Sequence, residues 1–400
     1  MTFEKFSLVS TLLGCLLFAC SAPPTDQNPS TNEAPAPAET VSTAPQMGQL
    51  LSQSDIEADD LIPGATSGVR IRYTSLDGLD GETPIEVTGA LYLPAGTAPE
   101  EGWPLIAWSH GTVGIADACA PSTAGRSERD LTYLSYWLER GYAIVASDYQ
   151  GLGTPDIHPY MATRPMAYNT LDGIRAVQQA DFPLTDAVVV TGQSQGASAA
   201  IATAGFAPGY APEIDLRAIS ATGVPYFPPL IQAALAAQGG GDTPDPNVAL
   251  GLYMLTLGEL VDPNFVLKDA VDEEIWPVVS QVYEKCVFDF VDIVVEAGLT
   301  SRQITTPETQ RIFPVAFSAM AYPSLELSVP AFVGMGETDT ITPLAMQKLF
   351  VQAACEAGSN IEAREYAGAG HNGGLLQSMP DAEAFIEKAF RGQTPEGSCE

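Results

Sequence analysis

The chain of 400 residues contains few basic residues and few histidines. Lys and Arg number 17 against 49 Asp and Glu, which gives a formal net charge of -32 with the histidines neutral. Such a surface repels phosphate backbones, so nucleic acid is excluded as an expected partner. The three histidines are His110, His158 and His371, and no pair of cysteines has the CxxC spacing of a metal site. We therefore expect neither a bound metal nor another cofactor.

No apolar run in the sequence is long enough to span a membrane. The short run near the N-terminus is typical of a targeting segment. Residues 8–19 are apolar, follow Lys5, and are too few to span a bilayer. The tetrapeptide LFAC that ends at Cys20 resembles the lipobox of bacterial lipoproteins, in which the cysteine becomes the acylated first residue. We expect residues 1–20 to be a lipoprotein-type signal peptide and Cys20 to be a lipid anchor to the outer membrane. Two alternatives stay open: a lipobox ending at Cys15, and an ordinary cleaved signal peptide of a secreted protein.

Residues 21–47 are rich in Pro, Ala, Ser, Thr, Asn and Gln and have few large apolar residues. Such a segment cannot bury enough surface to offset the entropy lost on ordering, so we expect a disordered tether.

Four cysteines remain after Cys20, and an even number in an exported protein predicts two disulfides. Spacing does not choose among the three possible pairings. We favour Cys119 with Cys286 and Cys355 with Cys399, which would fix an inserted segment and the C-terminus respectively.

From residue 68 onward, short apolar strands alternate with amphipathic helices. The expected strands are 69–73, 85–93, 104–108, 142–147, 187–191, 217–221, 330–333 and 361–366; the expected helices are 130–140, 169–180, 343–357 and 381–390, besides one that begins at 197. Nearly continuous Val and Ile strands joined by helices predict a mostly parallel sheet covered on both faces, in the α/β class. Between 224 and 322 the strands stop and only helical patterns remain. We expect the core at 48–223 and 323–400, with a helical cap inserted at 224–322.

The pentapeptide GQSQG at 192–196 follows a β-branched strand and precedes an Ala-rich helix. This is the setting of a nucleophile elbow, in which a strained turn lifts a serine hydroxyl above the sheet. Gly192 and Gly196 relieve the crowding of that turn, and Ser194 is the candidate nucleophile.

A serine needs a nearby base, and in this type of fold the acid and then the histidine follow the serine along the chain. Only His371 follows Ser194, so it is the candidate base. Asp339 lies in a loop after the strand 330–333 and is the candidate acid, with Glu337 as the local alternative.

The negative charge of a tetrahedral intermediate needs hydrogen-bond donors, which form an oxyanion hole. We expect one donor to be the backbone N–H of Gln195 and the other that of Thr112, in the loop after the strand 104–108. We interpret His110 and Asp148 as structural residues, with a second base as the alternative for His110.

Several of these motifs occur in the order found in the secretory lipase family: SHGT, ADACAPS, DYQGLG, GQSQG, GETDTITP and GHNGG, between residues 109 and 374. The chain resembles that family from about residue 60 to 390. The resemblance implies an α/β-hydrolase fold with a helical cap, a triad of Ser194, Asp339 and His371, and hydrolysis of carboxylic esters or triacylglycerols. Gln stands at both variable positions of the elbow, which departs from many members and leaves the acyl preference open. The apolar segment 248–261 either lines an acyl-chain pocket or only packs the cap onto the core.

The same triad also serves peptidases and acyltransferases, because an acyl-enzyme reacts with water, amine or alcohol. A binding protein that has lost catalysis is the alternative outside the enzymes. The intact Ser, Asp, His and glycines argue against it. The partner that we expect is therefore an ester or lipid substrate.

Overall fold

The computed structural model describes residues 47–238 and 240–399. The expected signal peptide, lipid-anchor cysteine and nearly all of the tether lie outside the described residues. Within the described ranges, no helix is both long enough and apolar enough to cross a membrane.

The described residues contain one sheet of nine strands, in the order β1-β2-β3-β5-β4-β6-β7-β8-β9. The first four of these strands pair antiparallel, and the pairs from β5 to β9 are parallel. The strands are β1 (Leu50–Asp55), β2 (Ala65–Leu76), β3 (Pro84–Pro94), β4 (Trp103–Ser109), β5 (Ala143–Ser147), β6 (Leu184–Gln193), β7 (Asp215–Thr222), β8 (Ala331–Gly336) and β9 (Ile361–Tyr366).

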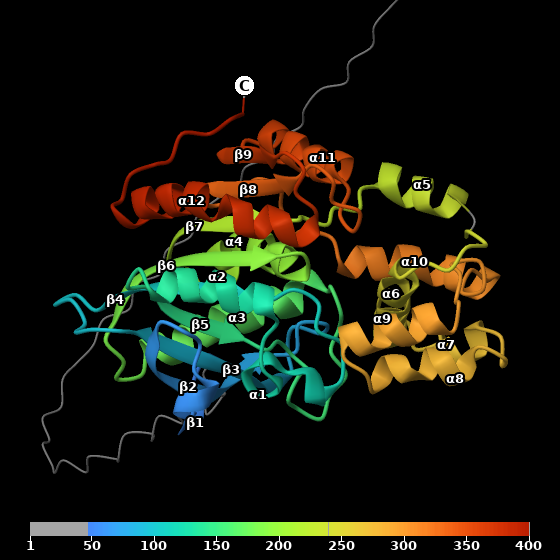
Figure 1. Cartoon of the computed structure of the whole chain (residues 1–400), viewed down its shortest axis with the longest axis horizontal. Coiled ribbons are helices and arrows are strands. Elements are labelled where there is room, and N and C mark those ends of the chain that lie inside the picture. The colour runs from blue at the N-terminus through green and yellow to red at the C-terminus, as the bar shows by residue number, and fades with distance from the viewer. Residues whose placement is uncertain (1–46, 239, 400) are drawn as a thin grey trace, which may run out of the picture. The chain divides into compact units, whose positions relative to one another are not determined.

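Helices cover both faces of this sheet (Figure 1). The helices are α1 (Pro121–Ala124), α2 (Glu128–Leu138), α3 (Thr163–Gln178), α4 (Gln195–Tyr210), α5 (Pro229–Gln238), α6 (Asn247–Val261), α7 (Leu267–Ala270), α8 (Trp276–Val279), α9 (Val287–Glu296), α10 (Pro307–Ala319), α11 (Leu344–Glu356) and α12 (His371–Phe390), with 3-10 turns η1 (Ala58–Asp60), η2 (Asp117–Cys119) and η3 (Ser280–Tyr283). Along β4, Leu105 and Ala107 join a core with α3, α4 and α11, whereas Ile106 and Trp108 join one with α2 and α12. Because side chains alternate along a strand, one apolar run serves both layers, which confirms the predicted α/β class.

Two helices begin six or more residues earlier than the sequence predicts. Helix α3 begins at Thr163 rather than at 169, and its first turn contains Pro165. Proline is tolerated there because the first N–H groups of a helix have no intrahelical acceptor. Helix α12 begins at His371 rather than at 381 and continues through Gly374 and Pro380. A Cβ at Gly374 would lie 3.3 Å from the Gly336 backbone nitrogen, so close packing against β8 favours glycine at a position that reads as a helix breaker.

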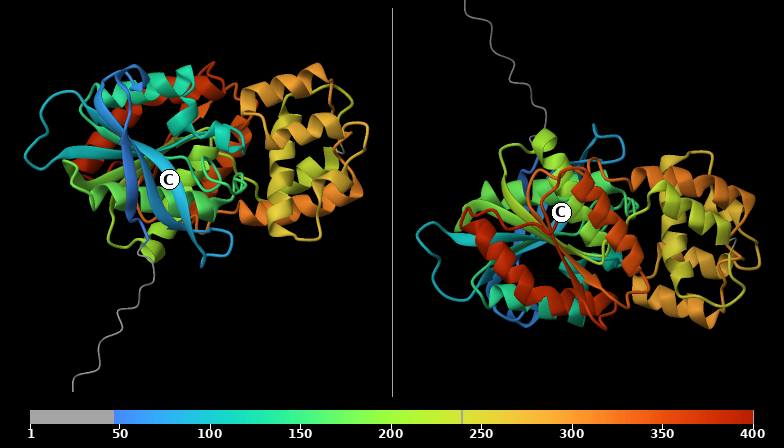
Figure 2. Two further views of the ribbon diagram at one scale, coloured as in Figure 1. Left: turned by 90° about the horizontal axis from the view of Figure 1, so that it is seen from below. Right: turned by 90° about the horizontal axis from the view of Figure 1, so that it is seen from above.

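Helices α5 to α10 follow β7 and precede β8. Figures 1 and 2 show α6 to α10 grouped beyond one end of the sheet. These helices supply most of an apolar cluster, to which Leu252, Tyr253 and Phe290 contribute and which Ile115 and Tyr160 of the core also join. We refer to helices α5 to α10 as the cap.

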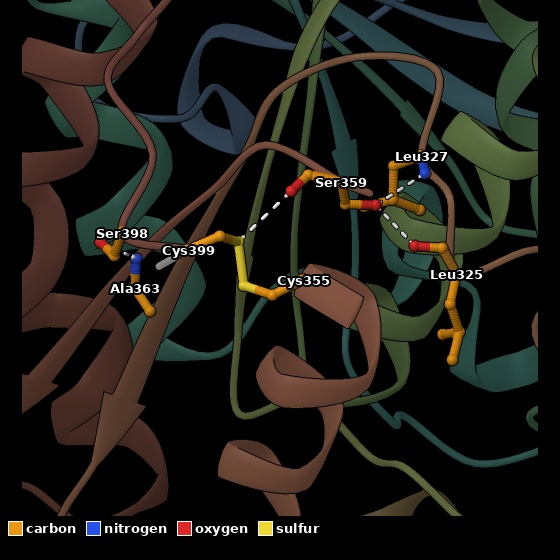
Figure 3. Close-up of a disulfide and its surroundings, with 7 residues drawn as sticks. All are labelled: Leu325, Leu327, Cys355, Ser359, Ala363, Ser398 and Cys399. Atoms are coloured by element: carbon orange, nitrogen blue, oxygen red, sulfur yellow. Dashed lines mark hydrogen bonds between the residues drawn. A yellow bond between two sulfur atoms is a disulfide. The ribbon is translucent and has the colours of Figure 1, made fainter. Parts of the chain in front are cut away.

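Both favoured disulfides are confirmed. Cys119 pairs with Cys286, so that η2 of the core is bonded to the residue before α9 of the cap. Cys355 of α11 pairs with Cys399, next to Ser398, whose hydroxyl accepts from the backbone N–H of Ala363 (Figure 3). The second bond therefore holds the C-terminal segment along β9.

Candidate functional site

The turn between β6 and α4 has the backbone of a nucleophile elbow. Ser194 has φ 59° and ψ -121°, a conformation that costs a non-glycine residue about 1–3 kcal/mol. A Cβ on Gly192 would lie 2.0 Å from the Gly196 carbonyl oxygen, and one on Gly196 would lie 1.9 Å from the Ser109 carbonyl oxygen. No side chain fits at either glycine, so the tight turn depends on both. It leaves the partly exposed Ser194 at the N-terminus of a buried helix.

His371 and Asp339 are in direct contact beyond the ends of neighbouring strands. His371 Nδ1 lies 2.8 Å from Asp339 Oδ2, with the histidine side chain 12% exposed and the carboxylate 1% exposed. The other oxygen of Asp339 accepts from the backbone N–H groups of Ile341 and Thr342, each at 2.9 Å. Burial acts to raise the pKa of Asp339, but the hydrogen bonds from His371 and Thr342 outweigh it and lower the pKa below its ordinary value. The carboxylate therefore stays ionised and fixes the Nδ1–H tautomer, which leaves Nε2 as the basic nitrogen.

Glu337, the alternative acid, faces another group. Its Oε2 accepts from the backbone N–H of Gly368 at 2.8 Å. Of the two carboxylates in this loop, it is thus Asp339 that is hydrogen-bonded to the candidate base.

The end of β7 brings the histidine next to the elbow. The backbone N–H of Ser194 donates to the Thr222 carbonyl at 2.9 Å. The next residue, Gly223, has φ 61°, and a Cβ there would lie 3.0 Å from His371 Cε1. Ser194 and the imidazole are therefore both adjacent to the same two-residue segment, and both line one cavity.

One predicted oxyanion donor, Gln195, is part of the elbow, and the other, Thr112, lines the cavity. Gln195 is the first residue of α4, so its backbone N–H has no carbonyl acceptor within that helix. Thr112 lines the cavity, and its hydroxyl is 2.9 Å from the hydroxyl of Tyr160. The loop between β4 and η2 thus brings Thr112 to the cavity that also contains Ser194.

This cavity has a volume of about 640 Å³. Its apolar wall comes partly from the cap and includes Leu250 and Met254 of α6 and Val287 of α9. The remaining large side chains of α6, such as Leu252 and Tyr253, are buried in the apolar cluster of the cap. Within the segment 248–261, some side chains therefore line the cavity and others are buried in the apolar cluster. The lining also contains charged side chains, among them Arg126, Arg129 and Asp130, so the site combines an apolar wall with polar groups.

Two residues interpreted as structural lie beneath the site. Asp148 is buried and accepts from the backbone N–H of Ser122 at 2.9 Å and from the hydroxyl of Thr88 at 2.8 Å. His110 is buried and stacked on Tyr149, with ring centroids 4.3 Å apart. Burial lowers the pKa of His110, which keeps the imidazole neutral. Neither residue lines the cavity, in keeping with a structural role.

The glutamines on either side of Ser194 have partners that the sequence did not indicate. Gln195 Nε2 lies 2.7 Å from His158 Nε2, and Gln193 Oε1 accepts from Arg129 at 2.8 Å. His158 and Arg129 belong to no motif, and only three-dimensional proximity reveals them. No group of three or more His, Cys, Asp or Glu side chains suited to a metal ion occurs in the described part of the chain.

Comparison with known proteins agrees with this architecture. The family model for secretory lipases matches residues 120–398. Lipase A of Moesziomyces aphidis is 26% identical over 285 residues, which are 66% of this chain and 58% of that protein. Lipase 5 of Candida albicans is 25% identical over 311 residues, covering 70% and 64%. The chain thus spans about three fifths of the length of these curated relatives.

Two solved structures have the same fold. Candida antarctica lipase A in its closed state superposes with a TM-score of 0.69 at 20% identity, covering 88% of this chain and 84% of that one. The ligand-bound rice cell wall degrading esterase LipA from Xanthomonas oryzae gives 0.68 at 20% identity, covering 87% and 100%. The described residues therefore have the α/β-hydrolase fold.

Proposed function

We propose that this chain, which belongs to the secretory lipase family, hydrolyses carboxylic esters or acylglycerols through a serine acyl-enzyme. The observation that carries the proposal is the 2.8 Å contact of His371 with Asp339 beside Ser194, at an apolar cavity of about 640 Å³. A strained nucleophile, an oriented base and an apolar pocket together suit acyl transfer from an ester with an apolar acyl group.

In this mechanism Ser194 Oγ attacks the ester carbonyl and His371 Nε2 takes its proton. Asp339 holds the imidazole in position and stabilises the imidazolium. The backbone N–H groups of Gln195 and Thr112 bind the oxyanion, and each such donor contributes about 10²- to 10³-fold to the rate. The protonated histidine then gives its proton to the leaving alcohol, and water releases the acyl group by the same steps in reverse.

A panel of p-nitrophenyl esters with short to long acyl chains tests this proposal on the wild type and on Ser194→Ala. We expect turnover by the wild type and its near-complete loss in the variant. A wild type inactive on every chain length, or an active Ser194→Ala, would contradict ester hydrolysis. A fluorophosphonate probe tests the nucleophile separately, because labelling that survives Ser194→Ala would mean that another residue is modified.

The protein is exported: its family is a secretory one, and its two disulfides are typical of proteins outside the cytoplasm. We further propose that Cys20 carries a lipid that holds the protein at the outer membrane, on the basis of the LFAC tetrapeptide. Labelling of expressing cells with palmitate compares Cys20→Ser with Cys15→Ser. Incorporation should be lost only in Cys20→Ser; if it persists there, Cys20 is not the lipid site.

A further inference from the structure

We propose that Arg129, Gln193 and Asn372 form a positioning clamp that holds the candidate base against the nucleophile elbow. This inference rests on the function proposed above. Arg129 and Asn372 also line the cavity, and the proposal is that they act by holding Ser194 and His371 in position. Arg129 is the second residue of α2. Its Nη1 donates to Gln193 Oε1 at 2.8 Å and to Asn372 Oδ1 at 3.2 Å. Gln193 precedes Ser194 and Asn372 follows His371, so one guanidinium nitrogen joins the neighbours of both reacting residues.

Gln193 also contacts the histidine segment directly. Its Nε2 donates to the His371 backbone carbonyl at 3.3 Å, and the side chain is fully buried. The orientation of the amide is fixed by its partners, because a guanidinium only donates and a carbonyl only accepts. Both ends of the Gln193 amide are thus used, and rotating it would break both bonds.

The guanidinium is itself held in place from the opposite side. Arg129 Nε donates to Asp130 Oδ1 at 2.8 Å, and Nη2 lies 2.7 Å from the same oxygen. The Asp130 side chain is 6% exposed and that of Arg129 17% exposed. A planar fork with several donors suits this arrangement, whereas the single ammonium of lysine does not reach all three acceptors.

The oxyanion loop packs against the same group. A Cβ on Gly111 would lie 3.0 Å from Gln193 Oε1 and 3.3 Å from Arg129 Nη2. Gly111 immediately precedes the predicted donor Thr112. The elbow, the histidine segment and the oxyanion loop therefore meet at one arginine, although they lie far apart in the sequence.

The chain provides a matched control on the same pair of helices. Arg140, two residues after α2, donates from Nε to Glu383 Oε1 of α12 at 2.8 Å. The Arg129–Asn372 and Arg140–Glu383 pairs are both 243 residues apart in sequence. Both arginines thus bridge the α2 region to α12, but neither Arg140 nor Glu383 lines the cavity. Replacing either arginine removes a bond between the α2 region and α12. Only replacing Arg129 should also change the position of the candidate base.

The experiment compares Arg129→Met and Arg140→Met, using an uncharged p-nitrophenyl ester and a thermal unfolding scan. Misplacing a reacting group by about 1 Å costs about a hundredfold in rate, so we expect kcat of Arg129→Met to fall about tenfold to a hundredfold. KM should stay within about threefold, because the ester is uncharged and the guanidinium is already hydrogen-bonded to Asp130, Gln193 and Asn372. Arg140→Met should keep kcat within about twofold and lose less thermal stability than Arg129→Met, because its ion pair is more exposed.

Two further variants separate positioning from a structural defect. Added guanidinium should restore part of kcat to Arg129→Ala, which has space for it, and none to Arg140→Ala. In a double-mutant cycle with Gln193→Met, the double variant should lose no more kcat than the worse single variant, because both residues act in one unit.

Four results decide the inference. A kcat of Arg129→Met equal to wild type, an equal fall in Arg140→Met, or a change confined to KM would each overturn the clamp while leaving ester hydrolysis intact. A wild type without esterase turnover and without fluorophosphonate labelling overturns the proposed function, and the clamp with it.

Discussion

The imidazole of His158 makes the stability of this protein sensitive to mild acid. The side chain is fully buried, with Nδ1 2.8 Å from the Gln150 carbonyl and Nε2 2.7 Å from Gln195 Nε2. The carbonyl requires Nδ1 to carry the proton, so Nε2 accepts from the amide of Gln195. Protonation would turn Nε2 into a donor that faces the amide of Gln195, the residue whose backbone N–H is the predicted oxyanion donor.

The magnitude follows from the pKa. Burial lowers the pKa of His158 from 6.5 to about 3. The unfolded chain takes up a proton as the pH falls below about 6.5, and the folded chain does not until about pH 3. The neutral histidine therefore makes its full contribution to the free energy of unfolding above pH 6.5. That contribution is lost progressively as the pH falls towards 3. At about 1.4 kcal/mol per pH unit, the loss between pH 7 and pH 5 is about 2 kcal/mol.

Urea unfolding at pH 7, 6 and 5 measures this loss in the wild type and in His158→Gln, which keeps a polar amide but does not titrate. The variant should start less stable at pH 7 and lose about 2 kcal/mol less than the wild type by pH 5. His110, whose pKa burial also lowers, is present in both proteins, so its contribution cancels in the difference. Equal losses in the two proteins would refute the argument that His158 is held neutral.

Further predictions concern the site and the cap. Asp339→Asn should keep the fold but lower kcat by about 10⁴-fold, because the histidine loses the partner that fixes its tautomer; circular dichroism and esterase kinetics check this, and a loss below tenfold would contradict the assigned acid. Gly223→Ala should lower both stability and kcat, because φ is 61° and the new Cβ would lie 3.0 Å from His371 Cε1; an unchanged kcat would mean that the ring adjusts freely. Replacing Cys119 and Cys286 by Ser opens a loop with a sequence separation of 167 and should cost about 2–4 kcal/mol in denaturant unfolding; a variant as stable as the wild type would show that the bond adds nothing.

The central layers could be predicted from the sequence because local chemistry determines them. Strands β4 to β8 centre on short apolar runs between turns, and the elbow needs glycine at both 192 and 196 on steric grounds alone. The candidate base followed from the scarcity of histidine after Ser194. These signals are local, or depend only on the order of residues along the chain.

The remaining features depend on contacts that no local pattern contains. Helix α12 tolerates Gly374 because β8 packs against it, which overrides the low helix propensity of glycine. Arg129 lies 64 residues from Gln193 and 243 from Asn372, and it reads in the sequence as an ordinary charge at the start of a helix. His158 likewise belongs to a loop without a recognisable motif.

The bond between Cys119 and Cys286 restricts how the cap can move. It is reinforced by a hydrogen bond from the backbone N–H of Val287 to the Val113 carbonyl at 2.8 Å, one residue beyond Thr112. Any displacement of the cap must therefore leave the start of α9 close to η2. The start of α9, and the part of the cavity wall it supplies, stays beside the oxyanion loop throughout. This part of the cavity wall should therefore move with the core, although its residues are part of the cap.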